Sequence, residues 1–451
     1  MIAPNSSILL TDLYMLTMLE AFHRKGMNGV ASYEFFVRAL PQNRGFLLAA
    51  GLEQALQFLE SAHFTAEEIE WLRSSGRFSA EFLGYLGQWR FEGDVHAMPE
   101  GTAFFPHEPI LRVTAPVCQA QLVETRLINI LHLQTLIASK AARCVLAAPG
   151  KLLVDFGMRR AHGAEAGLLA ARASYLAGFN GTATVLAGEQ FGIPLYGTMA
   201  HAYVQSHDTE SAAFESFADA QPDNVVLLID TYDTEQGART VVEIALRLRK
   251  KGIPIKAVRL DSGDLAEHSE RVRVILDEGG LRDTEIFCSG DLDEHRLQEL
   301  VQRGSPIDGF GVGTRLDTSA DAPYLECAYK LVEYEGQPRR KRSEGKGNWA
   351  GRKQVFRKYG DGPIMEADTV TLDSDRLEGE PLLQPVMLRG QRVQPAETLT
   401  LLRQRAAQQL GCLPAPLRAL ATQPSLPVNI SPVLQAATRE ADKQNRPPPE
   451  I

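Results

Sequence analysis

Four short segments of this chain each place an acid or a glycine turn directly after an apolar run. Three of them carry Asp230, Asp261 and Asp291, about 30 residues apart, and the fourth ends at Gly313. Such runs are typical of strands buried on both faces, and their repetition predicts successive βα units. Because chemistry gathers at the carboxyl ends of barrel strands, the pattern predicts an enzyme acting on a phosphorylated, metal-bound substrate.

The acids are suited to a hard metal ion. Carboxylate oxygens are ligands that Mg²⁺ prefers, often with substrate phosphates completing the shell. A single Asp after a strand is more often the N-cap of the next helix, and Asp264, which precedes Leu265, fits that alternative. Three acids at successive strand ends favour a site.

The glycine turns are suited to an anion. Ser289-Gly290-Asp291 and Gly311-Val312-Gly313-Thr314 follow late apolar runs, where barrels commonly hold phosphate. Glycines also serve ordinary tight turns, so one such turn alone is weak evidence. Two in consecutive late units favour phosphate binding.

Two further segments carry candidate groups. His201 ends the segment that contains Thr198, where a neutral imidazole could act as a base or as a nucleophile toward a phosphoryl group. Phe156, Arg159 and Arg160 follow an earlier apolar run; the arginines suit a carboxylate or phosphate, and the ring could stack on a flat ligand. The alternatives are a structural histidine, a surface arginine pair and a core phenylalanine.

Regular elements must position these groups. Helices are expected at 163–178, 180–191, 234–251, 264–279 and 293–303, and the longest helical pattern, at 117–142, precedes them. Strands are expected at 151–156, 194–199, 225–230, 255–261, 285–289 and 308–313.

The flanking regions lack this βα rhythm. A helix should begin at Thr11 or Asp12, followed by a strand at 31–40, helices at 47–61 and 66–74, and strands and turns at 91–113. Beyond 329 we expect a charged, glycine-rich loop at 335–351, short strands at 354–371, a helix at 396–409 and a disordered tail at 445–450. The predicted division is 1–125 for an N-terminal α+β domain, 126–330 for a barrel, 331–440 for a segment returning to the first domain, and 441–451 for a tail.

The composition of the chain narrows the classes of function that the protein could have. The chain has 451 residues, enough for more than one core, and its net charge of −9 argues against a nucleic-acid partner. Its five cysteines are scattered without metal-ligand spacing, and no signal or membrane segment is evident, so a cytoplasmic protein is expected. The basic run 339–342 reads as a solvated loop or a contribution to a phosphate site, and no P-loop pattern occurs.

Taken together, the motifs resemble those of nicotinate phosphoribosyltransferases over about residues 8 to 360. The matching segments are Thr11-Asp12-Leu13-Tyr14, Phe156-Gly157-Met158-Arg159-Arg160, Gly197-Thr198-Met199-Ala200-His201, Asp230-Thr231-Tyr232-Asp233, Arg259-Leu260-Asp261-Ser262-Gly263-Asp264, Ser289-Gly290-Asp291 and Gly311-Val312-Gly313-Thr314. The resemblance implies an irregular TIM-like α/β barrel with an additional α+β domain built from N- and C-terminal segments. It implies homodimers with shared sites, and synthesis of nicotinate mononucleotide and diphosphate from nicotinate and 5-phosphoribosyl 1-diphosphate, coupled to ATP hydrolysis with Mg²⁺, in NAD salvage.

The resemblance also implies roles for matching residues. His201 corresponds to the histidine that ATP phosphorylates, and Asp230 and Asp261 lie near the ribose and diphosphate, with Asp261 and Asp291 as candidate magnesium ligands. Tyr14, reaching across from a partner subunit, and Phe156 flank the pyridine. The remaining substrate-binding candidates are Arg159, Thr198, Arg259, Ser289, Gly290, Asp291, Gly313 and Thr314.

The residue at position 183 bears on which pyridine compound is the acceptor substrate. In the related amide-using enzymes an Asp stands at the place of Ala183 and accepts from the carboxamide, whereas a carboxylate there would repel nicotinate. Ala183 therefore favours the acid substrate. Two alternatives stay open: a transferase that uses nicotinamide or quinolinate, and a non-catalytic nucleotide-binding homologue.

Overall fold

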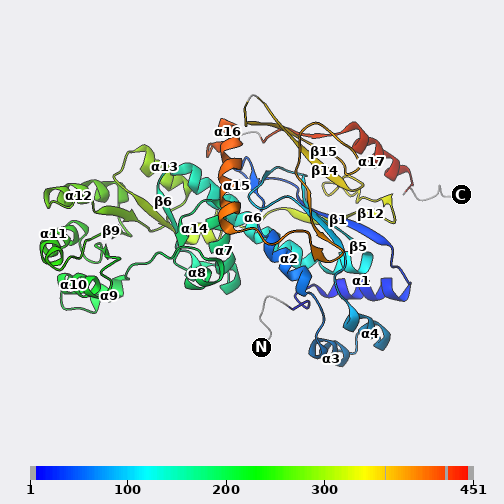
Figure 1. Cartoon of the computed structure of the whole chain (residues 1–451), viewed down its shortest axis with the longest axis horizontal. Helices are drawn as coiled ribbons and strands as arrows, with labels where there is room; N and C mark the ends of the chain where they lie inside the picture. The colour runs from blue at the N-terminus through cyan, green and yellow to red at the C-terminus, as the bar shows by residue number, and fades with distance from the viewer. Residues whose placement is uncertain (1–6, 361, 422–424, 445–451) are drawn as a thin grey trace. The chain divides into compact units, whose positions relative to one another are not determined.

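The computed structural model describes residues 7–360, 362–421 and 425–444. They form two compact units: unit 1 consists of Met1–Ser139 with Tyr324–Ile451, and unit 2 of Lys140–Pro323. Unit 1 therefore contains both ends of the chain, blue and red in Figure 1, and unit 2 is a single continuous insertion, largely green.

In the part of the chain described, unit 1 contains three sheets with mostly antiparallel pairing, and the largest of them combines early and late strands. In its seven-stranded sheet, β1 is hydrogen-bonded to β5 and to the late strand β12. In order across the sheet the strands are β13 (Gln337–Pro338), β12 (Cys327–Tyr334), β1 (Val30–Val37), β5 (Pro109–Pro116), β3 (Asp94–Ala97), β17 (Gln384–Leu388) and β18 (Gln391–Arg392). A four-stranded sheet contains β16 (Glu380–Pro381), β14 (Lys353–Tyr359), β15 (Met365–Leu372) and β19 (Val428–Ile430), and β2 (Leu47–Leu48) pairs with β4 (Ala103–Phe104).

The core of unit 1 is aromatic and also contains a buried ion pair. Tyr33 and Tyr329, from the paired strands β1 and β12, stack with ring centroids 5.0 Å apart. Arg357 and Asp368, from β14 and β15, form an ion pair at 2.6 Å with both side chains fully buried. The helices of unit 1 are α1 (Leu13–Arg24), α2 (Leu52–Ser61), α3 (Ala66–Ser74), α4 (Ala80–Gln88), α5 (Val117–Leu122), α15 (Leu399–Cys412), α16 (Ala415–Arg418) and α17 (Pro432–Gln444).

Unit 2 contains a six-stranded parallel sheet. In order across it the strands are β7 (Gly181–Thr182), β6 (Leu152–Asp155), β11 (Gly309–Val312), β10 (Glu285–Cys288), β9 (Ala257–Leu260) and β8 (Val226–Leu228). Since β11 lies beside β6, the last strand of the unit returns to the first. A single parallel bridge joins Thr182 to Leu195 beyond the β7 edge, and the Asn224 side chain near β8 donates to the Gly197 carbonyl at 3.2 Å. The protein is therefore a mixed α/β protein with parallel and antiparallel sheets.

The helices of unit 2 follow the strands and are capped by acids. Asp233, Asp264 and Asp293 accept backbone N–H bonds at the starts of α11, α12 and α13, so the capping alternative for Asp264 is confirmed. The elements are η1 (Met158–Arg160), α7 (Ala164–Ala177), α8 (Val185–Phe191), α9 (His201–Gln205), α10 (Glu210–Ala220), α11 (Thr234–Lys250), α12 (Leu265–Glu278), α13 (Glu294–Gln302) and α14 (Thr314–Asp317); α6 (Glu124–Ala147) begins in unit 1 and ends in unit 2.

Most predicted elements are present, and four predictions differ from the structure. The segment 194–199 forms one bridge rather than a strand, and the expected helix 180–191 begins with β7 and becomes helical only at Val185. The expected helix 47–61 starts with β2, because Gly51 adopts a φ of 98° and helix α2 begins after it. The helix 117–142 is divided at Val123 into α5 and α6. The expected tail at 445–450 lies outside the described residues.

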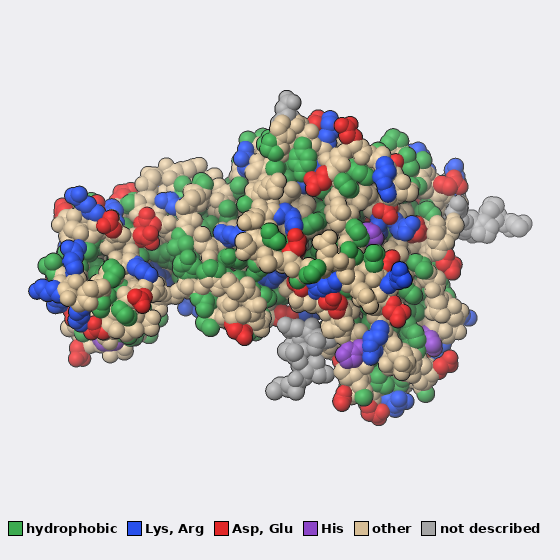
Figure 2. Space-filling view, in the orientation of Figure 1, with side chains coloured by type: hydrophobic (Ala, Val, Ile, Leu, Met, Phe, Trp, Pro, Cys, Tyr) green, Lys and Arg blue, Asp and Glu red, His purple; other side chains and the backbone are tan. Residues whose placement is uncertain are grey.

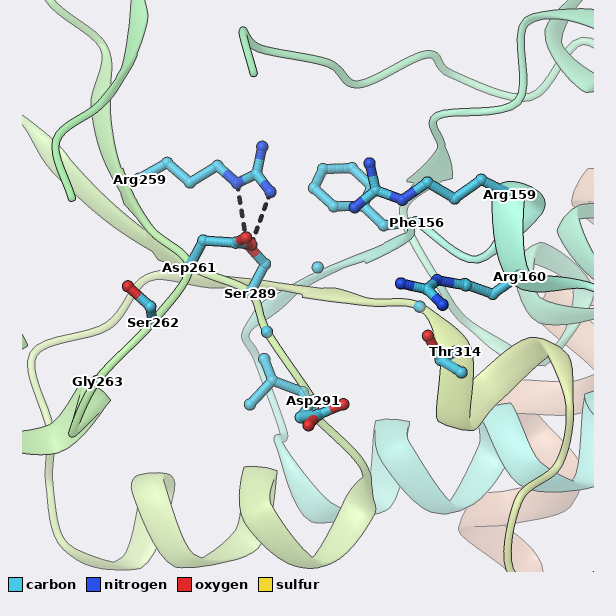
Figure 3. Close-up of a pocket in the computed structure, with 14 residues that line it drawn as sticks. Phe156, Arg159, Arg160, Arg259, Asp261, Ser262, Gly263, Ser289, Asp291 and Thr314 are labelled. Carbon is cyan, nitrogen blue, oxygen red and sulfur yellow. Dashed lines mark hydrogen bonds and ion pairs between the residues drawn. The ribbon is translucent and has the colours of Figure 1, made fainter. Parts of the chain in front are cut away.

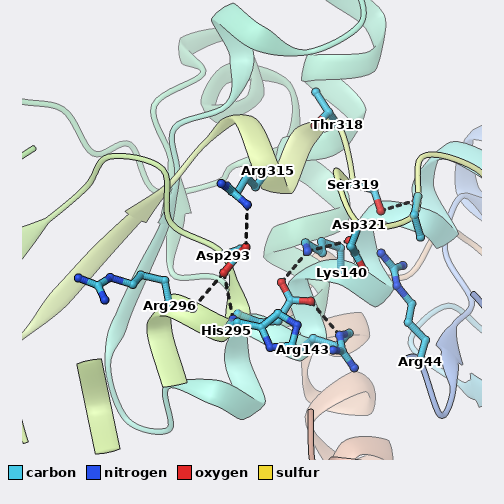
Figure 4. Close-up of polar contacts among 12 residues, drawn as sticks. Arg44, Lys140, Arg143, Asp293, His295, Arg296, Arg315, Thr318, Ser319 and Asp321 are labelled. Atoms are coloured by element: carbon cyan, nitrogen blue, oxygen red, sulfur yellow. Dashed lines mark hydrogen bonds and ion pairs between the residues drawn. The ribbon is translucent and has the colours of Figure 1, made fainter. Parts of the chain in front are cut away.

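A buried ion network joins α6 to α13 within unit 2 (Figure 4). Glu294 is fully buried and pairs with Lys140 at 2.5 Å and with Arg143 at 2.9 Å, and Lys140 also pairs with Asp321 at 2.7 Å. Removing one partner would leave an uncompensated buried charge, so the network holds α13 in place.

The surface is mixed in charge. On the face drawn in Figure 2, basic and acidic side chains are interspersed. Among the described residues, none of the helices combines the length and the apolar character that crossing a membrane requires.

Candidate active site

The carboxyl ends of the parallel strands in unit 2 surround two adjoining cavities. The first, which we call the polar pocket, has a volume of about 440 Å³. In Figure 3, Arg259 reaches into it from one side and Arg159 and Arg160 from the other. Its lining is Phe156, Arg159, Arg160, Arg259, Asp261, Ser262, Gly263, Ser289, Gly290, Asp291, Leu292, Gly311, Gly313 and Thr314.

The second cavity, which we call the ring pocket, has a volume of about 520 Å³ and is more apolar. It shares four residues with the polar pocket, so one ligand could occupy both. Its lining is Phe156, Met158, Arg159, Ala183, Gly197, Thr198, Met199, Ala200, His201, Leu228, Arg259 and Asp261.

Arg259 lies between the two pockets and contacts both. Its guanidinium donates to Ser289 at 2.9 Å, to Thr198 at 3.2 Å and to Asp261 at 2.7 Å. Its Cζ lies 5.4 Å from the centre of the Phe156 ring, a cation–π distance. The strand β9 and these four contacts give the cation a single orientation toward the cavity.

Asp261 remains ionised in this setting. Burial by itself would raise the pKa of Asp261, but the hydrogen bond from Ser289 and the charge of Arg259 outweigh it, and the pKa is lowered. The Asp261 side chain is 27% exposed, so the carboxylate is both charged and accessible to a ligand.

Asp230 was expected to lie near the ribose and diphosphate, but it does not face the pockets. Its side chain is 1% exposed and lines neither pocket. Its Oδ2 accepts from the Asp261 backbone N–H at 2.8 Å and from the Ser262 hydroxyl at 2.6 Å. Asp230 therefore stabilises the turn after β9 from its buried side.

His201 stands at the start of α9 with one ring nitrogen held and the other facing acids. Nδ1 lies 3.1 Å from Thr231 Oγ1, and Nε2 lies 3.9 Å from Asp261 Oδ2 and 4.0 Å from Asp230 Oδ1. The side chain is 39% exposed, so Nε2 is the nitrogen available to a ligand in the ring pocket.

The turn after β10 has an unusual backbone. Gly290 has a φ of 98°, and a side chain there would collide with the Asp261 carbonyl. Asp291 follows with a φ of 48°, also in the left-handed region, which non-glycine residues adopt mainly where surrounding structure enforces it. Such a turn exposes backbone N–H groups and suits an anion. Gly313 and Thr314 line the same pocket at the start of α14.

The residues fit a magnesium ion that is held mainly by a substrate. Asp230 Oδ1 is buried without a hydrogen-bond partner and, like Asp261 Oδ2, faces His201. Within the described ranges no cluster of three His, Cys, Asp or Glu residues could ligate a metal. Mg²⁺ commonly takes one or two carboxylates and fills its shell with water and phosphate oxygens. Asp261 and the exposed Asp291 both line the polar pocket and could serve it.

The structure brings eleven of the thirteen predicted site residues to these pockets. The exceptions are Asp230, which lies beneath them, and Tyr14, which is 50% exposed on α1 in unit 1. Arg160, which was considered from the sequence for a carboxylate or phosphate, also lines the polar pocket, whereas Ser262 and Gly263 were missed as site residues although they stand inside a recognised motif. Leu228, from the apolar run before Asp230, reaches the ring pocket from β8 and was predicted only as part of a strand.

Two family models match the chain. One is described as the nicotinate phosphoribosyltransferase (NAPRTase) N-terminal domain and matches residues 9–132; the other, the nicotinate phosphoribosyltransferase (NAPRTase) family, matches residues 152–349. The chain is 50% identical over 425 residues to nicotinate phosphoribosyltransferase pncB2 of Mycobacterium tuberculosis, covering 94% of this chain and 91% of the relative. It is 41% identical to nicotinate phosphoribosyltransferase of Bacillus subtilis over 72% of this chain and 66% of that relative.

Solved structures also match this chain. The human nicotinic acid phosphoribosyltransferase matches with a TM-score of 0.87 and 29% identity, over 95% of this chain and 99% of that one. A nicotinate-nucleotide pyrophosphorylase from Pyrococcus furiosus matches with a TM-score of 0.73 and 28% identity, over 89% and 94% of the two chains.

Proposed function

Because the chain belongs to the nicotinate phosphoribosyltransferase family, we propose that its strand-end pockets join nicotinate to 5-phosphoribosyl 1-diphosphate. The products are nicotinate mononucleotide and diphosphate, in NAD biosynthesis. The observation that carries the assignment is the position of Arg259, shared by an anion-binding pocket and an aromatic-lined pocket. A transferase needs both compartments side by side, one for the phosphorylated sugar and one for the pyridine.

The polar pocket would hold the sugar donor. The Gly290–Asp291 turn and the Gly313–Thr314 segment present backbone N–H groups for the 5-phosphate. Arg159, Arg160 and Arg259 line the cavity, and Arg groups stabilise the negative charge that grows on a leaving diphosphate. Asp261, ionised and partly exposed, would lie near the positive charge that grows on the ribose.

The ring pocket would hold nicotinate. Phe156 offers an aromatic face, and Arg159 offers a cation for the carboxylate. Holding the pyridine nitrogen close to the sugar converts an encounter into an intramolecular step, which supplies much of the rate. Ala183 is exposed to this pocket and adds no charge that would repel an acid.

ATP would act through His201. A phosphoryl group on Nε2 would add negative charge beside Asp230 and Asp261, which changes the affinity of the site for substrates and products. That change couples ATP hydrolysis to turnover. Mg²⁺, when bound with the diphosphate, neutralises its charge, and Asp261 and Asp291 would hold it.

We further propose a homodimer and an irregular barrel in unit 2. Leu13 and Tyr14 are each 50% exposed on α1, and exposed apolar side chains of this size often mark an interface. Tyr14 would then complete the ring pocket of a second copy. The bridge at Leu195 and the Asn224–Gly197 contact support closure of the barrel between β7 and β8. The sequence-based division at about 125, 330 and 440 stays a prediction.

The experiment is diphosphate release from phosphoribosyl diphosphate, with and without ATP. Nicotinate should support release and ATP should raise it. Release that requires nicotinamide or quinolinate instead would favour a transferase that uses one of those acceptors. Nucleotide binding without release on any of the three acceptors would favour a non-catalytic homologue.

A further inference from the structure

A buried acid lies under the ring pocket with no part in the chemistry described above. Asp155 ends β6 and is fully buried. Its Oδ1 accepts from the Gly157 N–H at 2.8 Å, and its Oδ2 accepts from the Thr182 hydroxyl at 2.7 Å. A buried carboxylate with two such contacts organises the backbone around it.

These contacts lead to two parts of the ring-pocket wall. Gly157 directly follows Phe156, Thr182 directly precedes Ala183, and both Phe156 and Ala183 line that pocket. The backbone of Asp155 makes a third contact, since its carbonyl accepts from the Ala183 N–H at 2.8 Å. One residue therefore connects the aromatic wall to the wall that bears on acceptor choice.

A second buried acid completes the arrangement. Asp317 ends α14, is 2% exposed, and its two carboxyl oxygens find no conventional donor among the described residues. It lies directly against Gly157, because a Cβ on that glycine would overlap the Asp317 carboxyl group. Gly157 is thus the residue that allows an acid to approach this turn.

Burial favours the protonated form of both acids. Burial raises the pKa of Asp317 well above its usual range, and the charge of Asp155 and a hydrogen bond with it raise the pKa further. Burial also raises the pKa of Asp155, but its bonds from Thr182, Gly157 and Asp317 oppose that change. The larger rise at Asp317 favours it as the partner that keeps its proton beside Asp155.

We propose that Asp155 is a positioning residue that sets the separation of the Phe156 and Ala183 walls, and that Asp317 holds it through a shared proton. The pair also ties these walls to α14, whose first residue, Thr314, lines the polar pocket. This inference rests on the proposed function, because the quantity it controls is the fit of the pyridine. It predicts selective loss of acceptor binding, with donor binding spared.

The first test removes one hydroxyl. Thr182→Val keeps the side-chain volume but loses the donor to Asp155, and Thr182→Ser keeps the donor. We expect Thr182→Val to raise the KM for nicotinate about tenfold, as for one lost charged hydrogen bond, and Thr182→Ser to restore it. The KM for phosphoribosyl diphosphate should stay within about twofold in both, since neither Thr182 nor Ala183 lines the polar pocket.

The second test exchanges the acids. Asp317→Asn still offers an N–H donor to Asp155, whereas Asp317→Leu does not, so only the leucine variant should raise the nicotinate KM. In Asp155→Asn, the side-chain NH₂ must face one of the two donors, the Gly157 N–H or the Thr182 hydroxyl. This variant should therefore also raise the nicotinate KM. Discrimination between nicotinate and bulkier 6-substituted pyridine acids should weaken in the same variants.

The possible outcomes distinguish a positioning role from a purely structural one, and a failure of this inference from a failure of the proposed function. A change in melting temperature or active fraction, with the nicotinate KM unchanged in Thr182→Val and Asp155→Asn, would mean a structural role only and overturn the inference. Equal increases in both substrate KM values would overturn it as well. A parent protein without nicotinate-dependent diphosphate release would refute the proposed function instead.

Discussion

Thr231 Oγ1 lies 3.1 Å from Nδ1 of His201, and this contact determines which ring nitrogen faces the pockets. With Nδ1 held, Nε2 points at the carboxylates of Asp230 and Asp261, at 4.0 and 3.9 Å. A phosphoryl group on Nε2 leaves the ring proton on Nδ1, where the threonine oxygen accepts it.

This relationship predicts a requirement for the Thr231 hydroxyl. Thr231→Val should lower the phosphohistidine formed from ATP about tenfold, because one hydrogen bond to the ring is lost. Thr231→Ser should keep it near the parent value. Acid-labile ³²P incorporation from labelled ATP measures the effect, and full incorporation in the valine variant would contradict it.

His201 itself should separate coupling from transfer. His201→Ala and His201→Glu should abolish ATP stimulation yet leave slow, uncoupled formation of nicotinate mononucleotide, because the pocket residues that bind both substrates remain. Product formation with and without ATP measures this. An alanine variant that ATP still stimulates normally would exclude the phosphohistidine route.

Arg259 should not tolerate lysine. Its guanidinium donates to Ser289, Thr198 and Asp261 at once, and an ammonium cannot reproduce that fork. Arg259→Lys should reduce kcat/KM by about 100-fold or more, comparable with the loss of one transition-state donor.

A surface arginine provides the control. Arg271 on α12 is 58% exposed and pairs with Glu235 and Glu267. Arg271→Lys should leave steady-state rates within about twofold, since exposed pairs contribute little. Equal losses in the two variants would show that the Arg259 contacts have no special role.

Ala183 should determine the acceptor. Ala183→Asp places a carboxylate in the ring pocket, where it repels nicotinate and can accept from a carboxamide. The ratio of kcat/KM for nicotinate over nicotinamide should fall by at least about tenfold, whereas Ala183→Asn should lower it less. An unchanged ratio would show that Ala183 does not face the substituent of the ring.

Within unit 1, buried and exposed ion pairs should contribute differently to stability. In unit 1, Asp368→Ala leaves fully buried Arg357 without its partner and should cost about 3–5 kcal/mol of unfolding free energy. Lys358→Ala, which breaks a pair 60% and 51% exposed on the same strands, should cost less than about 1 kcal/mol. Urea unfolding followed by circular dichroism measures both, and similar losses would contradict the burial argument.

The sequence by itself determined most of the parallel strands of unit 2 and most of the residues at their ends. Apolar runs longer than a surface strand needs, each followed by Asp230, Asp261, Ser289 or Gly313, carry that information locally. It also indicated α12 with its Asp264 cap, because capping depends on neighbours within three residues.

Only the tertiary structure decided how these residues divide their work. Asp230 supports the Asp261 turn instead of facing a ligand, and Asp155 meets Asp317 although they stand at opposite ends of unit 2 in the chain. The physical reason is strand order: β11 returns to lie beside β6, so distant segments become neighbours. The spacing of residues along the chain does not indicate that pairing, because the pairing arises only from long-range packing.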